Sequence, residues 1–198
     1  MNIASFLVYC VIVTFSPGPT NIVILSAVHN FGIKKAMRYV WGATAAFGLL
    51  LVISVVLNSM LMAVIPKILF VMQIIGSIYM LYLAYQINKP NVSEGDARQI
   101  ATFKTGFLMQ FINPKVIMFT MTVIPGFVMP YHTSPGILVL AVAAVSTVGF
   151  LAFGTWVLFG TIFKEFLQKY HKVVNIMMGL FLVYAAIILS GLVELLAG

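Results

Sequence analysis

The sequence predicts an all-α integral membrane protein with six transmembrane helices, on the basis of composition, charge placement and two polar interruptions. Hydrophobic residues make up 62% of the chain and charged residues 8%, whereas soluble domains carry about a quarter charged residues. The charges fall between long apolar windows, and two windows contain a proline-bearing break, "FSPGPTN" and "FINPKV". A water-soluble core cannot absorb this apolar excess, so residues 1–198 are predicted to form one domain with lipid as its solvent.

Charge-free windows place the helices, because a spanning helix needs about 20 mostly apolar residues. The first window has no Lys or Arg before it and a poor cleavage site, so it is predicted to be a retained helix and not a signal peptide. The window from 116 to 163 is too long for one span, and the turn-like stretch "PGFVMPYHTSPG" divides it. The six predicted helices cover residues 3–28, 39–62, 67–87, 104–124, 137–163 and 173–196.

Basic residues concentrate in alternate loops, which predicts the orientation in the membrane. The second loop carries only Lys67 and the fourth carries none. The odd-numbered loops carry Lys34, Lys35, Arg38, Lys89, Arg98, Lys104, Lys164, Lys169 and Lys172. These loops are therefore predicted to be cytoplasmic, with both termini on the extracytoplasmic side.

Six helices divide into two sets of three, and an odd number per set gives the halves opposite topology. The predicted repeats are residues 1–88 and 104–198, joined by a cytoplasmic linker at 89–103. Ser16-Pro17-Gly18 and Asn113-Pro114-Lys115 each lie near the middle of the first helix of a half, so helices 1 and 4 are predicted to be broken near the midplane. Paired breaks at corresponding positions are a sequence pointer to a transporter binding site.

The chemistry of the breaks suits a helix that ends and restarts. Ser and Asn are good N-caps, and Pro is favoured at the first helical position. Each restarted helix presents free amide donors and roughly half a positive charge. Since the halves are inverted, the two N-termini are predicted to converge from opposite directions on an anion-binding pocket.

Lys115 is the most unusual residue of the predicted spans. It follows Lys104 by 11 positions, which is about 16 Å along a helix, and a lysine at that depth costs at least about 2.5 kcal/mol. The acidic residues, Glu94, Asp96, Glu165 and Glu194, lie in loops or at the last helix end. The predicted partner of Lys115 is therefore a substrate carboxylate. The alternatives are a structural proline kink and a lysine that snorkels to the interface.

Polar residues around the breaks complete the candidate site. Asn21 and Gln110 are predicted to bind a substrate amino group, with hydrogen bonds to neighbouring helices as an equal alternative. His29 is a titratable candidate for proton handling near pH 7. The predicted substrate-binding residues are Ser16, Pro17, Gly18, Pro19, Thr20, Asn21, Gln110, Asn113, Pro114 and Lys115.

Several function classes are excluded at this point. The basic residues flank apolar runs and form no patch, so nucleic-acid binding is not expected. The predicted spans hold no His cluster, metal-ligand spacing or carboxylate pair, so neither an enzyme, a metal site nor a cofactor is expected. Small residues such as Gly42, Ala46, Ala141, Ala144 and Ala152 permit close helix contact within the chain or in a homodimer.

The motifs resemble those of the lysine exporter / homoserine-threonine resistance (LysE/RhtB) family of bacterial amino-acid exporters, over nearly the whole chain. The likeness rests on "SPGP" at 16–19, Gly32 and Gly42, "GSIYMLYLAY" at 76–85, and most specifically "FKTGFLMQFINPK" at 103–115, with Gly106 and Asn113-Pro114-Lys115. Ala84 replaces a glycine usual in the family, and the intramembrane acidic residues of some lysine- and arginine-exporting members are absent.

The resemblance implies a multi-pass protein of the bacterial inner membrane. It implies a secondary transporter that exports an amino acid or close analogue by alternating access, driven by the proton gradient. The missing acidic residues argue against a cationic substrate. An anion channel or a lipid scramblase that uses the same broken-helix passage is the alternative.

Overall fold

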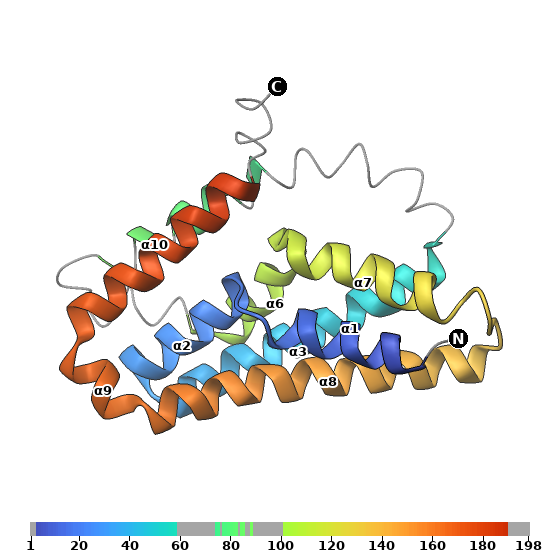
Figure 1. The fold of residues 1–198 in the computed structure, drawn as a ribbon, viewed down its shortest axis with the longest axis horizontal. Coiled ribbons are helices and arrows are strands. Elements are labelled where there is room, and N and C mark those ends of the chain that lie inside the picture. Colours follow the sequence, from blue (N-terminus) through green and yellow to red (C-terminus); the bar gives the residue numbers. More distant parts are fainter. Residues whose placement is uncertain are drawn as a thin grey trace.

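The computed structural model describes residues 3–58, 74–75, 77–82, 84–85, 88 and 101–189. All regular secondary structure within these residues is helical, which confirms the predicted all-α class. The helices are α1 (Ile3–Phe15), α2 (Pro19–Phe31), α3 (Ile33–Val56), α6 (Phe103–Ile112), α7 (Pro114–Phe127), α8 (Pro135–Ile162), α9 (Lys164–Lys169) and α10 (His171–Leu189) (Figure 1). Residues 89–100 of the predicted linker at 89–103, and residues 67–73, 76, 83, 86 and 87 of the third predicted helix, 67–87, lie outside the described residues.

Two long apolar helices and two broken ones form the body of the molecule. α3 and α8 are each long and apolar enough to cross a membrane. α1 and α2 together form a broken span bent by 47°, and α6 and α7 form another bent by 70°. α3 and α8 run the length of the molecule, while α1 and α7 lie toward one end and α2 toward the other (Figure 1). The described residues therefore contain two to four candidate spans, consistent with a membrane protein.

The observed helix bounds correct the predicted first loop. α2 continues to Phe31 and α3 already begins at Ile33, so Gly32 alone joins them. Gly32 has φ = 78°, a backbone conformation that glycine adopts without the Cβ clash of other residues. As a result Lys34, Lys35 and Arg38 belong to the first turns of α3 and not to a loop.

Two other predicted boundaries are also wrong. α7 includes Pro125 and ends at Phe127, since the first proline of the predicted turn is accommodated within the last helical turn. α9 occupies part of the predicted fifth loop. It packs against α2, α8 and α10, so this loop is a short helix that closes one end of the bundle.

Buried apolar residues form two separate hydrophobic cores. One core joins α2 and residues 36–43 of α3 to Phe153, Val157, Met178 and Leu182. The other joins α1 and α7 to residues 47–51 of α3 and to Val145. Buried polar side chains, including Thr14, Thr20, Asn21, Gln110 and Asn113, lie at or next to the two breaks. A polar layer thus divides the apolar interior at the level where both broken helices restart.

Close backbone contact holds α6 against α3. A Cβ added to Gly106 would lie 2.2 Å from the carbonyl oxygen of Tyr39, and one added to Gly42 would lie 2.0 Å from the carbonyl oxygen of Phe103. Only glycine permits this approach, because any side chain would overlap backbone atoms that cannot move independently. The pair of glycines therefore fixes the helix that leads into the second break.

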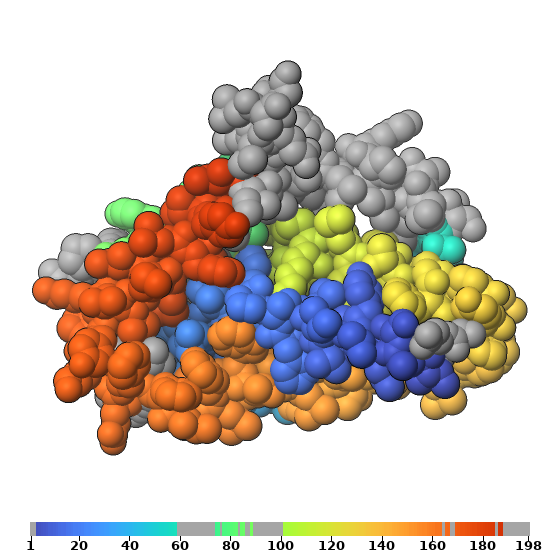
Figure 2. Space-filling view, in the orientation of Figure 1, coloured from blue at the N-terminus to red at the C-terminus, as the bar shows by residue number. Residues whose placement is uncertain are grey.

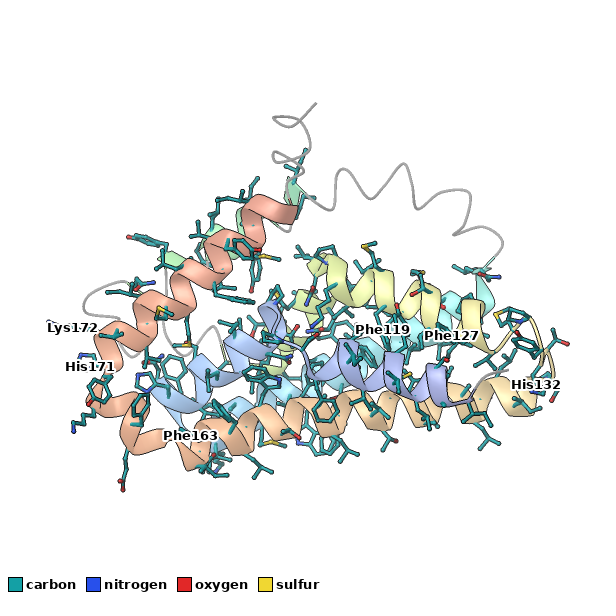
Figure 3. All side chains as sticks on the ribbon, in the orientation of Figure 1. Phe119, Phe127, His132, Phe163, His171 and Lys172 are labelled. Carbon is teal, nitrogen blue, oxygen red and sulfur yellow. The ribbon has the colours of Figure 1, made fainter. Side chains whose placement is uncertain are left out.

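The two ends of the bundle differ in charge. Figure 3 places His171 and Lys172 at the end formed by α9 and α10, and His132 at the opposite end, in the α7–α8 turn. The α2–α3 junction, which precedes Lys34 and Lys35, lies at the same end as α9. Basic residues of the first and fifth predicted loops therefore share one end of the molecule, and the side of the membrane that it faces stays a prediction.

Candidate functional site

The first break is defined by the carbonyl groups at the end of α1. A helix leaves its last carbonyl groups without intrahelical partners, and here side chains supply the partners. Nδ2 of Asn21 donates to the carbonyl oxygens of Thr14 at 3.4 Å and of Ser16 at 2.8 Å. The indole Nε1 of Trp156, from α8, donates to the carbonyl oxygen of Phe15 at 3.2 Å.

The restart of the first broken helix differs from the predicted one. Gly18 is the N-cap residue of α2, no side chain caps it, and Pro19 occupies the first helical position. Ser16 does not cap α2, because its hydroxyl donates to the carbonyl oxygen of Val13 at 3.0 Å. The prediction that a proline begins the second half-helix is correct, whereas the predicted serine cap is wrong.

The second break matches the predicted chemistry. Asn113 ends α6 and is also the N-cap residue of α7, where its side chain accepts a hydrogen bond from the backbone N–H of Lys115 at 3.1 Å. Pro114 takes the first helical position, where its missing N–H costs nothing. One residue therefore serves as both stop and start, which produces the sharper bend of the two breaks.

Lys115 connects the second break to the first. Its Nζ donates to the carbonyl oxygen of Ser16 at 2.7 Å, to Oγ of Ser16 at 3.0 Å and to the carbonyl oxygen of Pro17 at 3.2 Å. An ammonium has three N–H donors, so these three oxygens can use all of them. The oxygens are uncharged, but they lie at the C-terminal end of α1, where the helix dipole is negative.

A second set of hydrogen bonds, which does not involve the Lys115 ammonium, also joins the two breaks. Nδ2 of Asn113 donates to Oγ1 of Thr20 at 2.9 Å, and that hydroxyl donates to Oε1 of Gln110 at 3.1 Å. Nε2 of Gln110 donates in turn to the carbonyl oxygen of Gly106 at 3.1 Å. Thr20, Asn113 and Gln110 are almost fully buried. A buried network with every member bonded is rigid, so the two breaks are held together as one unit.

Two cavities adjoin this unit. The smaller one has about 30 Å³ of water-sized space and is lined at its polar side by Thr14, Gly18, Asn21 and Lys115. A single water needs at least about 10–15 Å³, so this cavity is large enough for water and too small for an amino acid. The larger one has about 290 Å³ and lies between the breaks and α10, where Figure 2 shows a hollow. Both cavities are lined by Gly18, Asn113 and Lys115, which therefore lie between them.

The structure brings the predicted site residues into one place, but two of them line neither cavity. Both ends of the Gln110 amide are used inside the protein, and Ser16 contacts the site through Lys115. Residues that the sequence did not single out also line the cavities. These are Val13, Phe47, Val116, Phe119 and Phe153 for the smaller one, and Met80, Met118, Phe181 and Tyr184 for the larger one. Thr14, which flanks the first break in the sequence, also lines the smaller one.

No sequence signal marked these apolar residues or Trp156, since aromatic and Met side chains are common throughout the spans. Among the described residues, no group of three His, Cys, Asp or Glu side chains could hold a metal ion. Lys115 is the one charged residue that lines either of the two cavities in the described part of the chain.

Broken helices that meet in a buried polar layer are a recurring feature of membrane transporters. The chain belongs to the LysE type translocator family, which it matches over residues 11–191. Members of this family are transporters and not enzymes, so that prediction and the predicted family are both confirmed.

Curated relatives cover almost the whole chain. The cysteine/O-acetylserine efflux protein of Klebsiella pneumoniae is 30% identical over 186 residues, which is 93% of this chain and 95% of that protein. The cysteine/O-acetylserine efflux protein of Salmonella typhimurium is 27% identical over 188 residues, 94% of this chain and 96% of that protein. The protein of the same name from Escherichia coli K12 is 26% identical over 186 residues, 93% and 95% of the two chains. No solved structure gives a significant match.

Proposed function

We propose that this chain is a secondary transporter that exports a small uncharged amino acid, of the cysteine or O-acetylserine type, from the cytoplasm by alternating access. One observation carries the proposal: Lys115 lies where both broken helices restart, between two cavities, and binds the end of α1. A buried lysine is costly in a membrane. Its cost is offset if the same ammonium binds the carboxylate of the transported amino acid.

The proposed binding site consists of the two breaks. Lys115 holds the carboxylate, helped by the N-terminal amides of α2 and α7. Asn21, whose Oδ1 has no partner, accepts from the amino group. Ser16, Pro17, Gly18, Pro19, Thr20, Asn113 and Pro114 shape the backbone on either side, and Gln110 positions Thr20.

The lining of the larger cavity supports an uncharged side chain as the cargo. Met80, Met118, Phe181 and Tyr184 present thioether and aromatic surface, which suits a short thiol or ester. Neither cavity is lined by an acidic residue within the described part of the chain, so a lysine- or arginine-like side chain would have no counter-charge there. The names of the curated relatives agree with this substrate class.

The proposed architecture is a single domain of six spans in the bacterial inner membrane, with inverted repeats at 1–88 and 104–198. The two bent helix pairs, which would be the first helices of the two repeats, support it. The basic end of the bundle is proposed to face the cytoplasm, which places both termini outside. The proposal also includes proton coupling, with His29 as the candidate proton carrier. It further includes contact with lipid and a homodimer formed through small-residue faces.

An anion channel or a lipid scramblase is the competing function for the same breaks. The small volume of the smaller cavity, about 30 Å³, favours a carrier, because a conducting pore needs a continuous aqueous path. A carrier saturates and exchanges substrate across the membrane, whereas a channel does neither.

Counterflow in proteoliposomes tests the proposal. Vesicles preloaded with a mixture of amino acids, including cysteine and O-acetylserine, are diluted into labelled amino acids, and exchange is followed for the wild type and Lys115→Met. We expect saturable exchange of small uncharged amino acids and its loss in Lys115→Met. Lys104→Met is the matched control, because Lys104 is exposed on the same broken helix, and it should retain exchange. Normal exchange by a well-folded Lys115→Met would refute the role of Lys115, and leak without saturation would favour the channel.

A further inference from the structure

The breaks present a cation and a set of acceptors to each other. The ammonium of Lys115 belongs to the second break, and the carbonyl oxygens of Ser16 and Pro17 belong to the first, at distances of 2.7 and 3.2 Å. These carbonyls form the negative end of the α1 dipole. The arrangement thus contains one positive group and one partially negative group, in direct contact and bonded through the lysine tip.

Asn21 adds an acceptor that the protein does not use. Its side chain is 3% exposed and lines the small cavity together with Lys115. Both close neighbours of the amide, the carbonyls of Thr14 and Ser16, are acceptors, so the amide must turn its nitrogen toward them. Its Oδ1 is buried and has no hydrogen-bond partner. A buried acceptor left unpaired is costly, so Oδ1 needs a donor, which a water in the small cavity supplies when no substrate is bound and which the substrate can replace.

We infer that the transporter recognises its substrate as a zwitterion, by an exchange of partners at Lys115. The α-carboxylate takes the ammonium of Lys115 away from the end of α1. The α-ammonium of the substrate then takes the carbonyl oxygens of Ser16 and Pro17 that Lys115 leaves, together with Oδ1 of Asn21. This inference rests on the proposed function and specifies which groups of the substrate the site reads.

The exchange conserves hydrogen bonds and charge. The α-ammonium has three donors, and the three acceptors offered to it are the two released carbonyls and Oδ1 of Asn21. Lys115 exchanges neutral oxygens for a carboxylate, which is the stronger partner. Only the hydroxyl of Ser16 loses a bond, the one it accepts from Lys115, and it keeps its own bond to the carbonyl oxygen of Val13. The substrate brings no net charge into the membrane interior.

The same exchange connects binding to movement. Lys115, Gly18 and Asn113 lie between the two cavities, and a Cβ on Gly18 would be 3.1 Å from both Cδ and Nζ of Lys115. The lysine therefore fits closely over the bare backbone of the first break. When its tip leaves the end of α1, the wall between the small and the large cavity loses the three hydrogen bonds of Lys115.

Two analogues of cysteine isolate the two halves of the zwitterion. 3-Mercaptopropionate is cysteine without its amino group, so it would leave the carbonyls of Ser16 and Pro17 unpaired. Cysteamine is cysteine without its carboxylate, so it would bring a second cation to Lys115. Each is measured as an inhibitor of labelled cysteine counterflow, with the full chain in proteoliposomes under reducing conditions.

We expect both analogues to inhibit at least about tenfold more weakly than unlabelled cysteine. If either analogue inhibits as well as cysteine, the partner exchange is wrong, while saturable cysteine exchange that Lys115→Met abolishes would still uphold the proposed function. If the wild-type protein exchanges no cysteine, the proposed function and this inference both fail.

Ser16→Ala provides a second test, because the partner exchange predicts tighter and not weaker cysteine binding in this variant. The hydroxyl of Ser16 accepts from Lys115 at 3.0 Å, but it is not among the acceptors offered to the substrate. Its removal also deletes the bond to the carbonyl oxygen of Val13 within the first break, but among the contacts of Lys115 it weakens only one that the substrate must displace. We therefore expect the half-saturation concentration for cysteine to fall by about two- to tenfold. Ser134→Ala is the control, because Ser134 makes no capping hydrogen bond, and it should leave this concentration unchanged. An unchanged or raised value in a folded Ser16→Ala would overturn the exchange.

Discussion

Both breaks contain proline, but their unpaired backbone groups find hydrogen-bond partners in opposite ways. At the first break, the carbonyls at the end of α1 receive donors from Asn21, Trp156 and Lys115. At the second break, a side chain supplies the cap, since Asn113 binds the N–H of Lys115. The first break therefore presents backbone acceptors, and the second supplies side-chain donors.

This difference shows that two breaks with similar proline-containing sequences need not be chemically equivalent. An acceptor end and a donor side chain attract each other, which explains why Lys115 and Asn113 both reach across to the first break. Two identical breaks, each with a free helix N-terminus, would repel. In the proposed binding site, the asymmetry would give a direction, with an anion-binding side at Lys115 and a cation-binding side at the end of α1.

The largest loss of stability is expected from Gly106→Ala, which should displace α6 and with it the second break. The new Cβ would lie 2.2 Å from the carbonyl oxygen of Tyr39 and 3.1 Å from the backbone N of Ala43. Since these are backbone atoms of α3, the helices must separate, and we expect a loss of about 3 kcal/mol or more. The loss is measured as yield and thermal stability in detergent.

Gly154→Ala is the control for this substitution, because a Cβ at Gly154 would have no heavy atom within 4 Å. It should keep the wild-type melting temperature. Equal stability of Gly106→Ala and Gly154→Ala would mean that α6 is not fixed by its contact with α3, and that the second break is as adjustable as the first.

A smaller loss of stability should distinguish the second break from the first. Asn113→Ala removes the cap of α7 and the hydrogen bond to Thr20, and we expect a loss of about 2–3 kcal/mol. Ser16→Ala removes no cap and should change the stability by about 1 kcal/mol or less. Thermal unfolding of both variants in the same detergent measures the difference.

Asn113→Ser divides the loss into its two parts. Serine is a good N-cap, but its side chain is too short to replace the bond from the asparagine amide to Thr20. Its melting temperature should therefore lie between those of the wild type and Asn113→Ala. Equal losses for Ser16→Ala and Asn113→Ala would contradict the proposed difference between the breaks.

The position of both breaks could be predicted from the sequence, because proline has a local and unambiguous effect on a helix. The detail of the first break could not. Prolines at 17 and 19 each fit the first position of a new helix, so "SPGP" allows two starting points. The structure uses Pro19, which makes Gly18 the cap residue and releases Ser16 for Lys115.

The partner of Lys115 was not predictable for a different reason. Its main acceptors are backbone carbonyls 99 and 98 positions away, and every residue carries a carbonyl, so no side-chain pattern marks them. The same holds for Trp156, whose acceptor is the carbonyl of Phe15. Gly106 carried a recognisable motif, but its contact with Tyr39 depends on how α3 and α6 cross, which the sequence alone does not specify.

The smallest expected effect comes from Trp156→Phe, which tests whether each carbonyl at the first break needs its donor. Phenylalanine keeps an aromatic ring beside Phe159 and removes only the N–H bonded to Phe15. We expect a loss of about 1 kcal/mol in stability and exchange reduced by no more than several-fold, because this carbonyl is not among those offered to the substrate. Trp41→Phe is the control, since Trp41 is exposed and stacks on Phe150. If Trp156→Phe abolished exchange as Lys115→Met is expected to do, the whole end of α1, and not only the carbonyls of Ser16 and Pro17, would belong to the binding site.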